Sequence, residues 1–316
     1  MSTEVRRAAE ILKRGGLVAF PTETVYGLGA DASNAAAIAR LYAVKRRPAD
    51  HPVIVHFADA DAAFEWAREV PGSARRLAAA FWPGPLTLIL KRSARAADFV
   101  TGGQDTIGLR VPGHPVAHAL LSAFDGGIAA PSANRFGRIS PTAAAHVRAD
   151  LDADVDLVLE GGASEIGIES TIVDLSDARA VLLRPGAIGR EALEAVLGEA
   201  VLEKTAAPGA GPRHSGGLER HYAPRTPTRL VAMHALDQEI GASGARIAVL
   251  AFSRPDTRVK VWRRMPRDPR AYARKLYAML RVLDDSGCDA ILVESPPQTP
   301  EWAAVNDRLR RACSDA

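Results

Sequence analysis

Short apolar runs and longer stretches with helical spacing alternate along the first two thirds of the chain. Apolar runs bounded by turn residues predict strands at residues 17–20, 53–57, 86–90, 106–111, 128–130, 157–160, 171–175 and 180–184. Helical spacing predicts helices at residues 4–14, 35–44, 60–69, 73–81, 114–124, 141–149 and 190–197. Many strands with intervening helices indicate a mixed, twisted and largely open α/β sheet. The last two strands are close enough to form a hairpin, so we expect a sheet that is not purely parallel.

The pattern changes after residue 203. Residues 204–227 are rich in proline and glycine and lack apolar periodicity, so we expect a linker there. Beyond it, strands are predicted at residues 229–233, 246–252, 259–262 and 290–294, and helices at residues 268–286 and 300–312. This alternation predicts a small α/β domain of Rossmann-like character that contains no GxGxxG motif. The expected organisation is a domain at 1–203, the linker at 204–227 and a domain at 228–316.

The linker contains one motif that differs from its surroundings, His221-Tyr222-Ala223-Pro224. An aromatic residue and a histidine between proline- and glycine-rich stretches are compatible with a segment that folds over a site. They are equally compatible with a simple hydrophobic anchor for the linker.

The stretch Pro21–Gly29, PTETVYGLG, gathers two threonines, a carboxylate and a tyrosine directly after the first predicted strand. Proline ends a strand because it has no N–H group. The two glycines allow a close backbone approach to a ligand, or a positive φ. Asn34 is a predicted helix cap, and the helix that it begins brings Lys45 and Arg47 to the end of this strand–loop–helix unit. α/β sheets usually bind ligands at that end.

Two interpretations of Lys45 and Arg47 follow from their position. Basic residues in a last helical turn often only offset the helix dipole, a contribution of roughly 0.3–1 kcal/mol. This chain has six lysines against 34 arginines. A lysine beside two arginines therefore indicates a role that a compact ammonium fills and a guanidinium does not. An ammonium fits on a phosphate oxygen where a planar guanidinium would not.

Further polar residues follow predicted strands. Arg110 ends one of them, where a buried cation needs either a carboxylate or phosphate ligand or an internal salt bridge. Residues 131–134, PSAN, place a hydroxyl and an amide directly after another strand, where they could cradle polyphosphate. Ser140 is either the cap of the next helix or part of an anion site at its N-terminus. His56 lies in an apolar strand, where a histidine is more often a satisfied core residue.

Composition narrows the function classes. Hydrophobic residues make up 47% of the 316 residues and charged residues 24%, as in soluble globular proteins. We expect neither secretion nor a membrane span, and the two cysteines without a CxxC motif fit a reducing cytoplasm. We identify no metal-ligand pattern. A net charge of +3 is too small for a surface that coats nucleic acid, although four arginines near residue 267 form either a local basic patch or a solvated face: Arg263, Arg264, Arg267 and Arg270.

Six motifs occur in one order: PTETVYGLGADA, KRRPADHPVIVH, TIGLRVPGHP, APSAN, ESTIVDL and LRPGAI. Together they resemble the YrdC/YwlC family of L-threonylcarbamoyladenylate synthases. The chain is similar nearly end to end to the long form of that family, which carries a second, C-terminal domain. The resemblance implies a nucleotidyltransferase that converts L-threonine, bicarbonate and ATP to threonylcarbamoyl-AMP and pyrophosphate. The product serves tRNA threonylcarbamoyladenosine modification, so downstream transfer proteins and a weak contact with tRNA are the expected partners.

The resemblance also implies site residues. The L-threonine site would comprise Thr24, His56, Arg110, Ala130 and Ser170. The ATP site would comprise Lys45, Arg47, His51, Thr106, Ser132, Ser140, Arg184 and Tyr222. Lys45 and Arg47 would act in catalysis by offsetting charge on the phosphate oxygens, and Mg²⁺ is expected with ATP rather than in a metal site of the protein.

The chain departs from the family pattern at two places. The family has asparagine where this chain has His51, and its linker begins Ser-Pro-Gly-Met where this chain has residues 215–218, SGGL. Two alternative functions stay open. One is carbamoyl transfer of the hydrogenase-maturation type, whose proteins carry CxxC pairs that this chain lacks. The other is an RNA-binding module without catalysis, suggested by the pI near 9.0.

Overall fold

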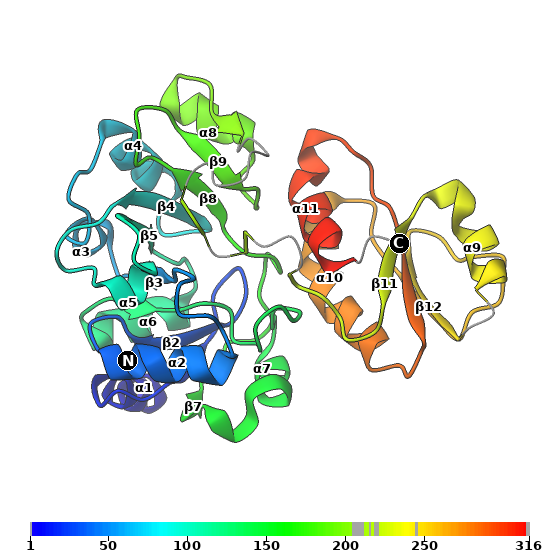
Figure 1. Cartoon of the computed structure of the whole chain (residues 1–316), viewed down its shortest axis with the longest axis horizontal. Coiled ribbons are helices and arrows are strands. Elements are labelled where there is room, and N and C mark those ends of the chain that lie inside the picture. Colours follow the sequence, from blue (N-terminus) through cyan, green and yellow to red (C-terminus); the bar gives the residue numbers. More distant parts are fainter. Residues whose placement is uncertain (1, 204–211, 215, 218–220, 244–245, 314–316) are drawn as a thin grey trace. The chain divides into compact units, whose positions relative to one another are not determined.

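The computed structural model of the chain describes residues 2–203, 212–214, 216–217, 221–243 and 246–313. They fall into two compact units (Figure 1). The first comprises Met1–Phe136, Pro141–Glu165 and Glu169–Gly217. The second comprises Gly137–Ser140, Ile166–Ile168 and Leu218–Ala316. The predicted linker falls in part on residues 204–211, 215 and 218–220, which lie outside the described residues.

One mixed sheet organises the first unit. Its strands are β1 (Val18–Phe20), β2 (Gly27–Asp31), β3 (Ile54–His56), β4 (Leu86–Lys91), β5 (Thr106–Arg110), β6 (Ile128–Ala129), β7 (Leu157–Val158), β8 (Thr171–Asp174), β9 (Val181–Arg184) and β10 (Leu202–Glu203). Their order across the sheet is β10-β9-β8-β4-β5-β3-β6-β2-β1-β7. Parallel pairs such as β3–β5 and β4–β8 neighbour antiparallel pairs such as β4–β5 and β8–β9. The predictions of a mixed sheet and of a terminal hairpin are therefore confirmed.

Helices connect these strands. They are α1 (Thr3–Lys13), α2 (Ala35–Lys45), α3 (Ala60–Phe64), α4 (Gly72–Phe81), α5 (Asp98–Thr101), α6 (Pro115–Phe124), α7 (Ala144–Leu151) and α8 (Arg190–Leu197). Local chemistry sets the limits of α2. The Asn34 side chain accepts hydrogen bonds from the N–H groups of Ala36 and Ala37, as its predicted role as a cap requires. Arg46, in the left-handed region at φ 55°, ends the helix directly after Lys45.

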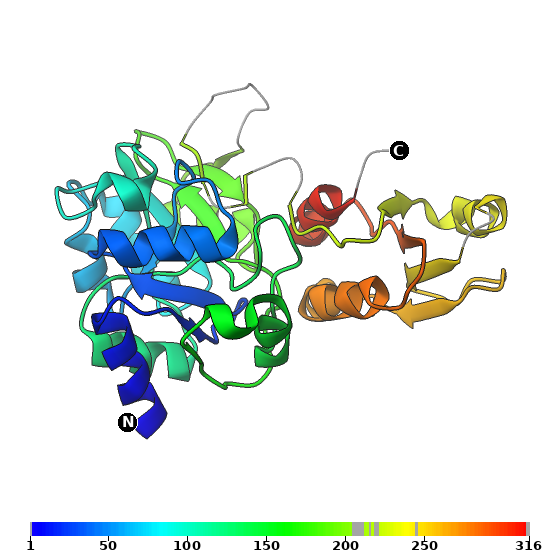
Figure 2. The ribbon, with the colours of Figure 1, turned by 60° about the horizontal axis from the view of Figure 1, so that its bottom comes forward.

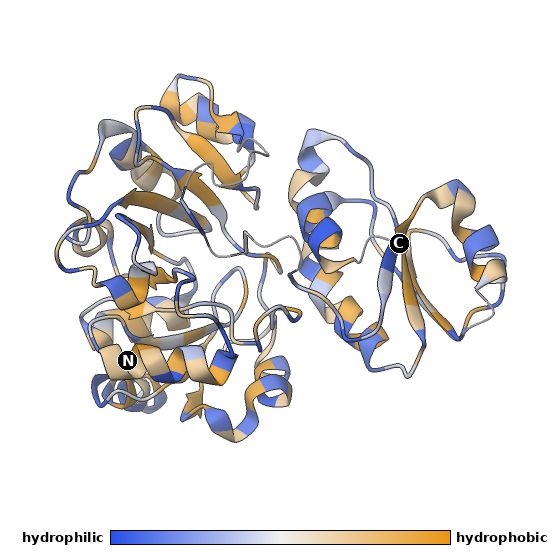
Figure 3. Cartoon of the chain, viewed as in Figure 1, coloured by the Kyte–Doolittle hydropathy of each residue, from blue (hydrophilic) through white to orange (hydrophobic). Residues whose placement is uncertain are grey.

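The two faces of the sheet are buried differently. On one face a large apolar core joins alternate strand residues, such as Leu88 and Leu109, to α2, α4 and α8. On the other face a second core packs α1 and α6 against β1 and β6, and a small cluster contains Ile54, Ile89 and Ile172. Figure 3 shows the apolar residues concentrated along these strands. Side chains alternate between the two faces along a strand. Residues two positions away from a member of the small cluster therefore point to the same face as the cluster.

The stretch Pro21–Gly29, predicted as the loop of a strand–loop–helix unit, is not a loop over its whole length. Its last three residues begin β2, which is antiparallel to β1. A Cβ atom at Gly29 would lie 3.0 Å from both the Phe20 ring and the Ile128 side chain. Glycine is therefore needed there for close packing between strands, not for approach to a ligand.

The prediction for the helix at 141–149 is wrong at its start. The helix, α7, begins at Ala144, and Ala143 is its N-cap. Pro141 instead accepts a hydrogen bond from the N–H group of Tyr26, which ties it to the segment before β2. Ser140 is therefore not the cap of this helix.

The second unit is built on four parallel strands, β11 (Thr228–Val231), β12 (Ile247–Ala251), β13 (Val261–Arg264) and β14 (Ala290–Glu294), in the order β11-β14-β12-β13. Helices α10 (Pro269–Asp284) and α11 (Ala303–Ala312) lie on one face and α9 (Leu236–Ala242) on the other (Figures 1 and 2). The expected small Rossmann-like domain is confirmed.

Candidate functional site

A row of side chains crosses the first unit on the face opposite its large core. Strand pairing sets His56 opposite Arg110, Arg110 in line with Thr87, Thr87 opposite Ile172, and Ile172 opposite Arg184. Residues directly opposite on neighbouring strands point to the same face of a sheet. β3, β5, β4, β8 and β9 therefore present a histidine, two arginines and a hydroxyl side by side.

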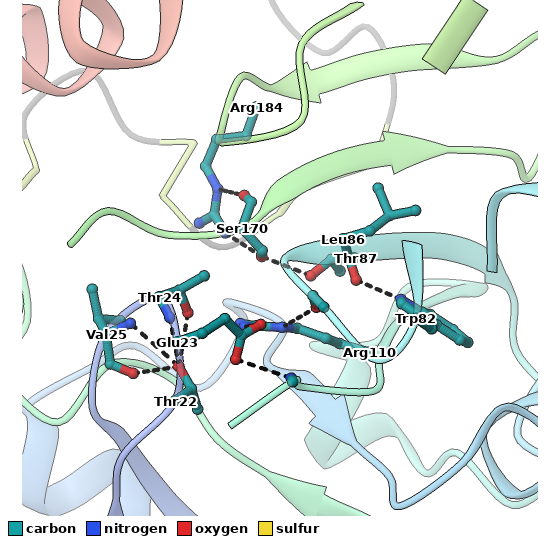
Figure 4. Close-up of polar contacts among 12 residues, drawn as sticks. Thr22, Glu23, Thr24, Val25, Trp82, Leu86, Thr87, Arg110, Ser170 and Arg184 are labelled. Carbon is teal, nitrogen blue, oxygen red and sulfur yellow. Dashed lines mark hydrogen bonds and ion pairs between the residues drawn. The ribbon is translucent and has the colours of Figure 1, made fainter. Parts of the chain in front are cut away.

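The centre of this row is a buried ion pair (Figure 4). Arg110 Nη2 lies 2.6 Å from Glu23 Oε1, and Arg110 Nε donates to the carbonyl oxygen of Gly84 at 3.2 Å. Glu23 Oε2 accepts a hydrogen bond from the N–H group of Gly113. Both side chains are nearly excluded from solvent, 5% and 11% exposed. The internal salt bridge that the sequence left open for Arg110 is thus present.

Glu23 was not among the predicted site residues. Its signal in the sequence was a carboxylate in the strand-end stretch 21–29, together with an arginine at another strand end that needed a partner. Glu23 and Arg110 are 87 residues apart in the chain, so only the fold reveals the pair.

Hydroxyl groups fix the turn that carries Glu23. Thr22 Oγ1 donates to the carbonyl oxygen of Val25 at 2.6 Å and accepts from the N–H groups of Thr24 and Val25. The Thr22 and Thr24 hydroxyls lie 2.8 Å apart, and both residues are buried. This local network is an alternative to strand hydrogen bonding, and it presents Glu23 to Arg110.

A second hydroxyl cluster lies farther along the row (Figure 4). Arg184 Nε donates to the carbonyl oxygen of Ser170 at 3.0 Å, and Arg184 Nη2 donates to Ser170 Oγ at 3.1 Å. Ser170 Oγ also lies 2.8 Å from Thr87 Oγ1. Two predicted site residues, Ser170 and Arg184, are thus in direct contact, and Thr87 joins them without having been predicted.

His56 is buried beside Arg110. Its Nδ1 has no hydrogen-bond partner among the residues that the structure describes, and its ring meets Phe20 edge to face. Burial, and then the positive charge of Arg110, lower the pKa of His56 well below its usual range. The imidazole is therefore neutral near pH 7. Ala130 is close by, because its N–H group donates to the carbonyl oxygen of Ile54 in the same strand as His56.

Lys45 is 1% exposed at the end of α2. Its Nζ donates to the carbonyl oxygens of Ser132 and Asn134, at 2.5 and 2.6 Å. Burial, and then the charge of Arg47, lower the pKa of Lys45 well below its usual range. Nζ thus holds the predicted polyphosphate cradle in shape, and in its charged form a third donor is left for a ligand.

Arg47 and His51 form a neighbouring group around Phe136. Arg47 Nη2 donates to the carbonyl oxygen of Pro52 at 2.7 Å, and its guanidinium stands over the Phe136 ring at 5.5 Å. The His51 ring meets the same ring edge to face at 5.4 Å. Burial, and then the charge of Arg47, lower the pKa of His51.

One segment joins the lysine group to the Arg110 row. Gly27 forms a β-bridge with Ser132, whose carbonyl oxygen holds Lys45, and four residues earlier Glu23 holds Arg110. Residues 23–27 therefore link the contacts of Lys45 and Ser132 to those of Arg110 within the first unit.

Three predicted ATP residues take no part in the contacts described above. Thr106 begins β5, about 13 Å along the strand from Arg110 at 3.3 Å per residue. Ser140 belongs to the second unit. So does Tyr222, which packs there against Tyr277, with the Arg308 guanidinium 5.4 Å from its ring centre. These contacts anchor Tyr222 within the second unit, and a contact of Tyr222 with ATP stays a prediction.

The described residues contain no group of three or more His, Cys, Asp or Glu side chains placed to hold a metal ion. Among the helices that the structure describes, none is long and apolar enough to cross a membrane.

The ten-stranded sheet is similar to that of YciO from E. coli, whose crystal structure matches 58% of this chain and 89% of its own length with a TM-score of 0.51 and 26% identity. This likeness places the first unit among the YrdC-like α/β domains. The family profile described as "Telomere recombination" matches residues 10–186, and the one described as "Threonylcarbamoyl-AMP synthase, C-terminal domain" matches residues 188–314.

Similar proteins extend over both units. A threonylcarbamoyl-AMP synthase of Pyrococcus abyssi is 38% identical, with 98% of this chain and 94% of the relative covered, and one of Bacillus subtilis is 39% identical, with 98% and 92% covered. The crystal structure of P. abyssi Sua5 complexed with L-threonine matches with a TM-score of 0.91 and 37% identity, over 98% of this chain and 94% of that one. The chain belongs to the threonylcarbamoyl-AMP synthase family, and it is an enzyme. A likeness to HypF at 21% identity shows the fold alone.

The buried ion pair predicts a large effect of Glu23→Gln on stability. The variant leaves Arg110 buried without its charge partner, and we expect the free energy of unfolding of the first unit to fall by about 3–5 kcal/mol. Asp105→Asn, which breaks the exposed pair with Arg68, should cost less than about 1 kcal/mol. Urea unfolding measures both. Equal losses in the two variants would contradict the role of the buried pair.

His56 predicts a pH dependence of stability. Its pKa in the folded state lies below the value near 6.5 of an unfolded chain, so the unfolded state binds more protons between these two values. Its contribution to stability is complete above pH 6.5 and is lost as the pH falls toward the folded-state pKa, by up to about 1.4 kcal/mol per pH unit. Urea unfolding between pH 7.5 and 5 should show a weaker pH dependence for His56→Gln than for His118→Gln, a change at an exposed histidine. Identical slopes would refute the prediction.

Proposed function

We propose that the first unit converts L-threonine, bicarbonate and ATP to threonylcarbamoyl-AMP, with release of pyrophosphate. The observation that carries this proposal is the Arg110 row. A guanidinium fixed on two sides, beside a neutral histidine and a serine–arginine cluster, is prepared for a small anionic substrate. The synthase names of the full-length relatives and the threonine complex of P. abyssi Sua5 support the choice of substrate.

Arg110 would bind the threonine carboxylate. Its Nε and Nη2 are engaged by Gly84 and Glu23, and its Nη1 has no hydrogen-bond partner in the described part of the chain. Glu23 thus holds the fork in one orientation and leaves an edge of it for a carboxylate. Thr24, His56, Ala130 and Ser170 would complete this subsite.

The cations of the neighbouring group would bind ATP. Lys45 keeps one donor after its two carbonyl contacts, and a phosphate oxygen beside it would favour the charged form that burial disfavours. Arg47 and His51 flank it, Ser132 contributes its hydroxyl, and Arg184 lies at the far end of the row. Thr106, Ser140 and Tyr222 belong to the proposed ATP site by family resemblance.

The proposed chemistry has two steps. The amine of threonine condenses with bicarbonate to form a carbamate, and water leaves. A carbamate oxygen then attacks the α-phosphorus, the bond to the β-phosphate breaks, and pyrophosphate carries away the electron pair. Lys45 and Arg47 would stabilise charge on the phosphate oxygens, an effect worth several kcal/mol in a dry site.

Mg²⁺ is expected to enter with ATP. The donors around the proposed site are hydroxyls, backbone groups and cations, and Glu23 is occupied by Arg110, so the phosphate oxygens themselves would carry the ion. Mg²⁺ would neutralise phosphate charge. The side chains described above would orient the substrates.

The product would supply the threonylcarbamoyl group for tRNA threonylcarbamoyladenosine, through separate transfer proteins in the cytoplasm. No step of the proposed reaction needs RNA. An RNA-free assay therefore separates the synthase from an RNA-binding module without catalysis.

The experiment measures pyrophosphate release with ATP, Mg²⁺, L-threonine and bicarbonate. Release should require all of them. Arg110→Lys should raise the KM for L-threonine about 10- to 100-fold, because one cation–carboxylate hydrogen-bond set is lost, while the KM for ATP changes little. Arg68→Lys, a change at an exposed arginine, is the matched control.

Two results would count against the proposal. Pyrophosphate release without threonine or without bicarbonate would exclude this reaction. An unchanged KM for threonine in Arg110→Lys would leave the reaction standing but remove Arg110 from the threonine subsite.

A further inference from the structure

The second unit holds a strongly basic stretch, residues 253–275. It contains nine lysines and arginines and two aspartates, a net charge of +7. The whole chain carries +3, so the remaining residues carry −4. The positive charge of the protein is thus concentrated in residues 253–275, although the net charge of the whole chain is modest.

This segment follows β12, forms β13 and continues into α10. β13 is an edge strand, since β12 is its neighbour on one side and it ends the sheet order on the other. All nine basic side chains are exposed. Arg263 and Arg264 are consecutive on β13, so they point to opposite faces of the sheet edge. Arg267 directly precedes the N-cap of α10, and Arg270 lies in the first turn of that helix.

The arginines of the segment lack acidic partners. None of them forms an ion pair with a carboxylate of the described residues, and they are Arg254, Arg258, Arg263, Arg264, Arg267, Arg270 and Arg274. Three arginines elsewhere in the same unit do form such pairs: Arg225 with Asp284, Arg229 with Glu239 and Arg246 with Asp289. Unpaired like charges repel one another in the folded protein, so a partner of opposite charge would lower the energy of this surface.

The chemistry of the segment fits phosphate groups. Seven of its nine basic residues are arginines, whose planar forks bind phosphate oxygens in pairs. Arg267 is held in place: its Nη2 donates to Ser253 Oγ at 3.3 Å, and its guanidinium stands over the Phe252 ring at 5.5 Å. One fixed and several free guanidiniums are suited to a chain of phosphates.

A protein partner would be expected to meet an apolar centre as well as charge. The exposed large apolar residues of the described chain are Leu202, Leu230, Met233 and Val282. None lies within residues 253–275. The surface therefore favours a nucleic-acid backbone over an acidic protein.

We propose that residues 253–275, which include β13 and the start of α10, form a binding surface for the phosphate backbone of RNA. The choice of RNA rests on the proposed function, which supplies a group for tRNA. The surface itself is independent of the Arg110 row, so its variants should leave pyrophosphate release unchanged.

The test compares two variants with equal loss of charge. Arg263→Gln/Arg264→Gln/Arg270→Gln removes three arginines of the segment and spares Arg267. Arg6→Gln/Arg7→Gln/Arg14→Gln removes three exposed arginines, two in α1 and one at its C-cap. An unmodified tRNA transcript is the probe, and its affinity is measured between about 50 and 200 mM salt.

The segment variant should bind at least tenfold more weakly than the wild type at low salt. Its slope of log K against log salt should be smaller by about 2 to 3, since each lost phosphate contact contributes about 0.7–0.9. The α1 variant should bind as the wild type does. Equal weakening in both variants, or in neither, would overturn the proposal, and so would equally tight binding of duplex DNA or of poly-L-glutamate.

Charged residues on an edge strand also oppose edge-to-edge aggregation, so the first variant could lose solubility. Arg254→Gln/Arg258→Gln/Arg270→Gln leaves β13 intact and should weaken tRNA binding in the same way. Unchanged binding by this soluble variant would overturn the proposal. Pyrophosphate release, measured on the same preparations, reports separately on the proposed function.

Discussion

The site depends on the buried pair between Arg110 and Glu23. A guanidinium at the end of a central strand cannot be left without a partner when it is nearly excluded from solvent. The carboxylate that satisfies it comes from the turn after β1, and the Thr22 hydroxyl holds this turn through the backbone of Val25. The same segment continues to Gly27, which forms a β-bridge with Ser132. The carbonyl oxygen of Ser132 accepts a hydrogen bond from Lys45 Nζ. One electrostatic requirement therefore fixes both halves of the proposed site.

The pair between Arg110 and Glu23 lies on the polar face of the sheet, which differs from the opposite face. The opposite face is filled by an apolar core under α2, α4 and α8, whereas the row from His56 to Arg184 consists mainly of polar side chains. Those side chains satisfy one another where they can, as Ser170, Thr87 and Arg184 do. In the proposed site, a group without a partner among the described residues, such as His56 Nδ1, would meet the substrate.

Much of this arrangement was predictable from local patterns. Apolar runs and caps located most strands and the limits of helices such as α1 and α2, and six motifs indicated the family. Long-range pairing was not predictable: Glu23 meets Arg110 across 87 residues, and Thr87 joins Ser170 across 83. Gly29 was misread because a glycine that allows close strand packing and one that approaches a ligand look alike in sequence. The start of α7 was misread because the backbone of Pro141 is engaged by Tyr26.

The central claim is that Glu23 holds Arg110 ready for a substrate carboxylate. Calorimetric titration with L-threonine and with L-threoninamide, which has the same side chain but no carboxylate, tests it most directly. The account predicts that the wild-type protein binds threonine at least tenfold more tightly than the amide, since a charged hydrogen-bond set is worth about 1.5–3 kcal/mol. Equal affinity for the two compounds would contradict it.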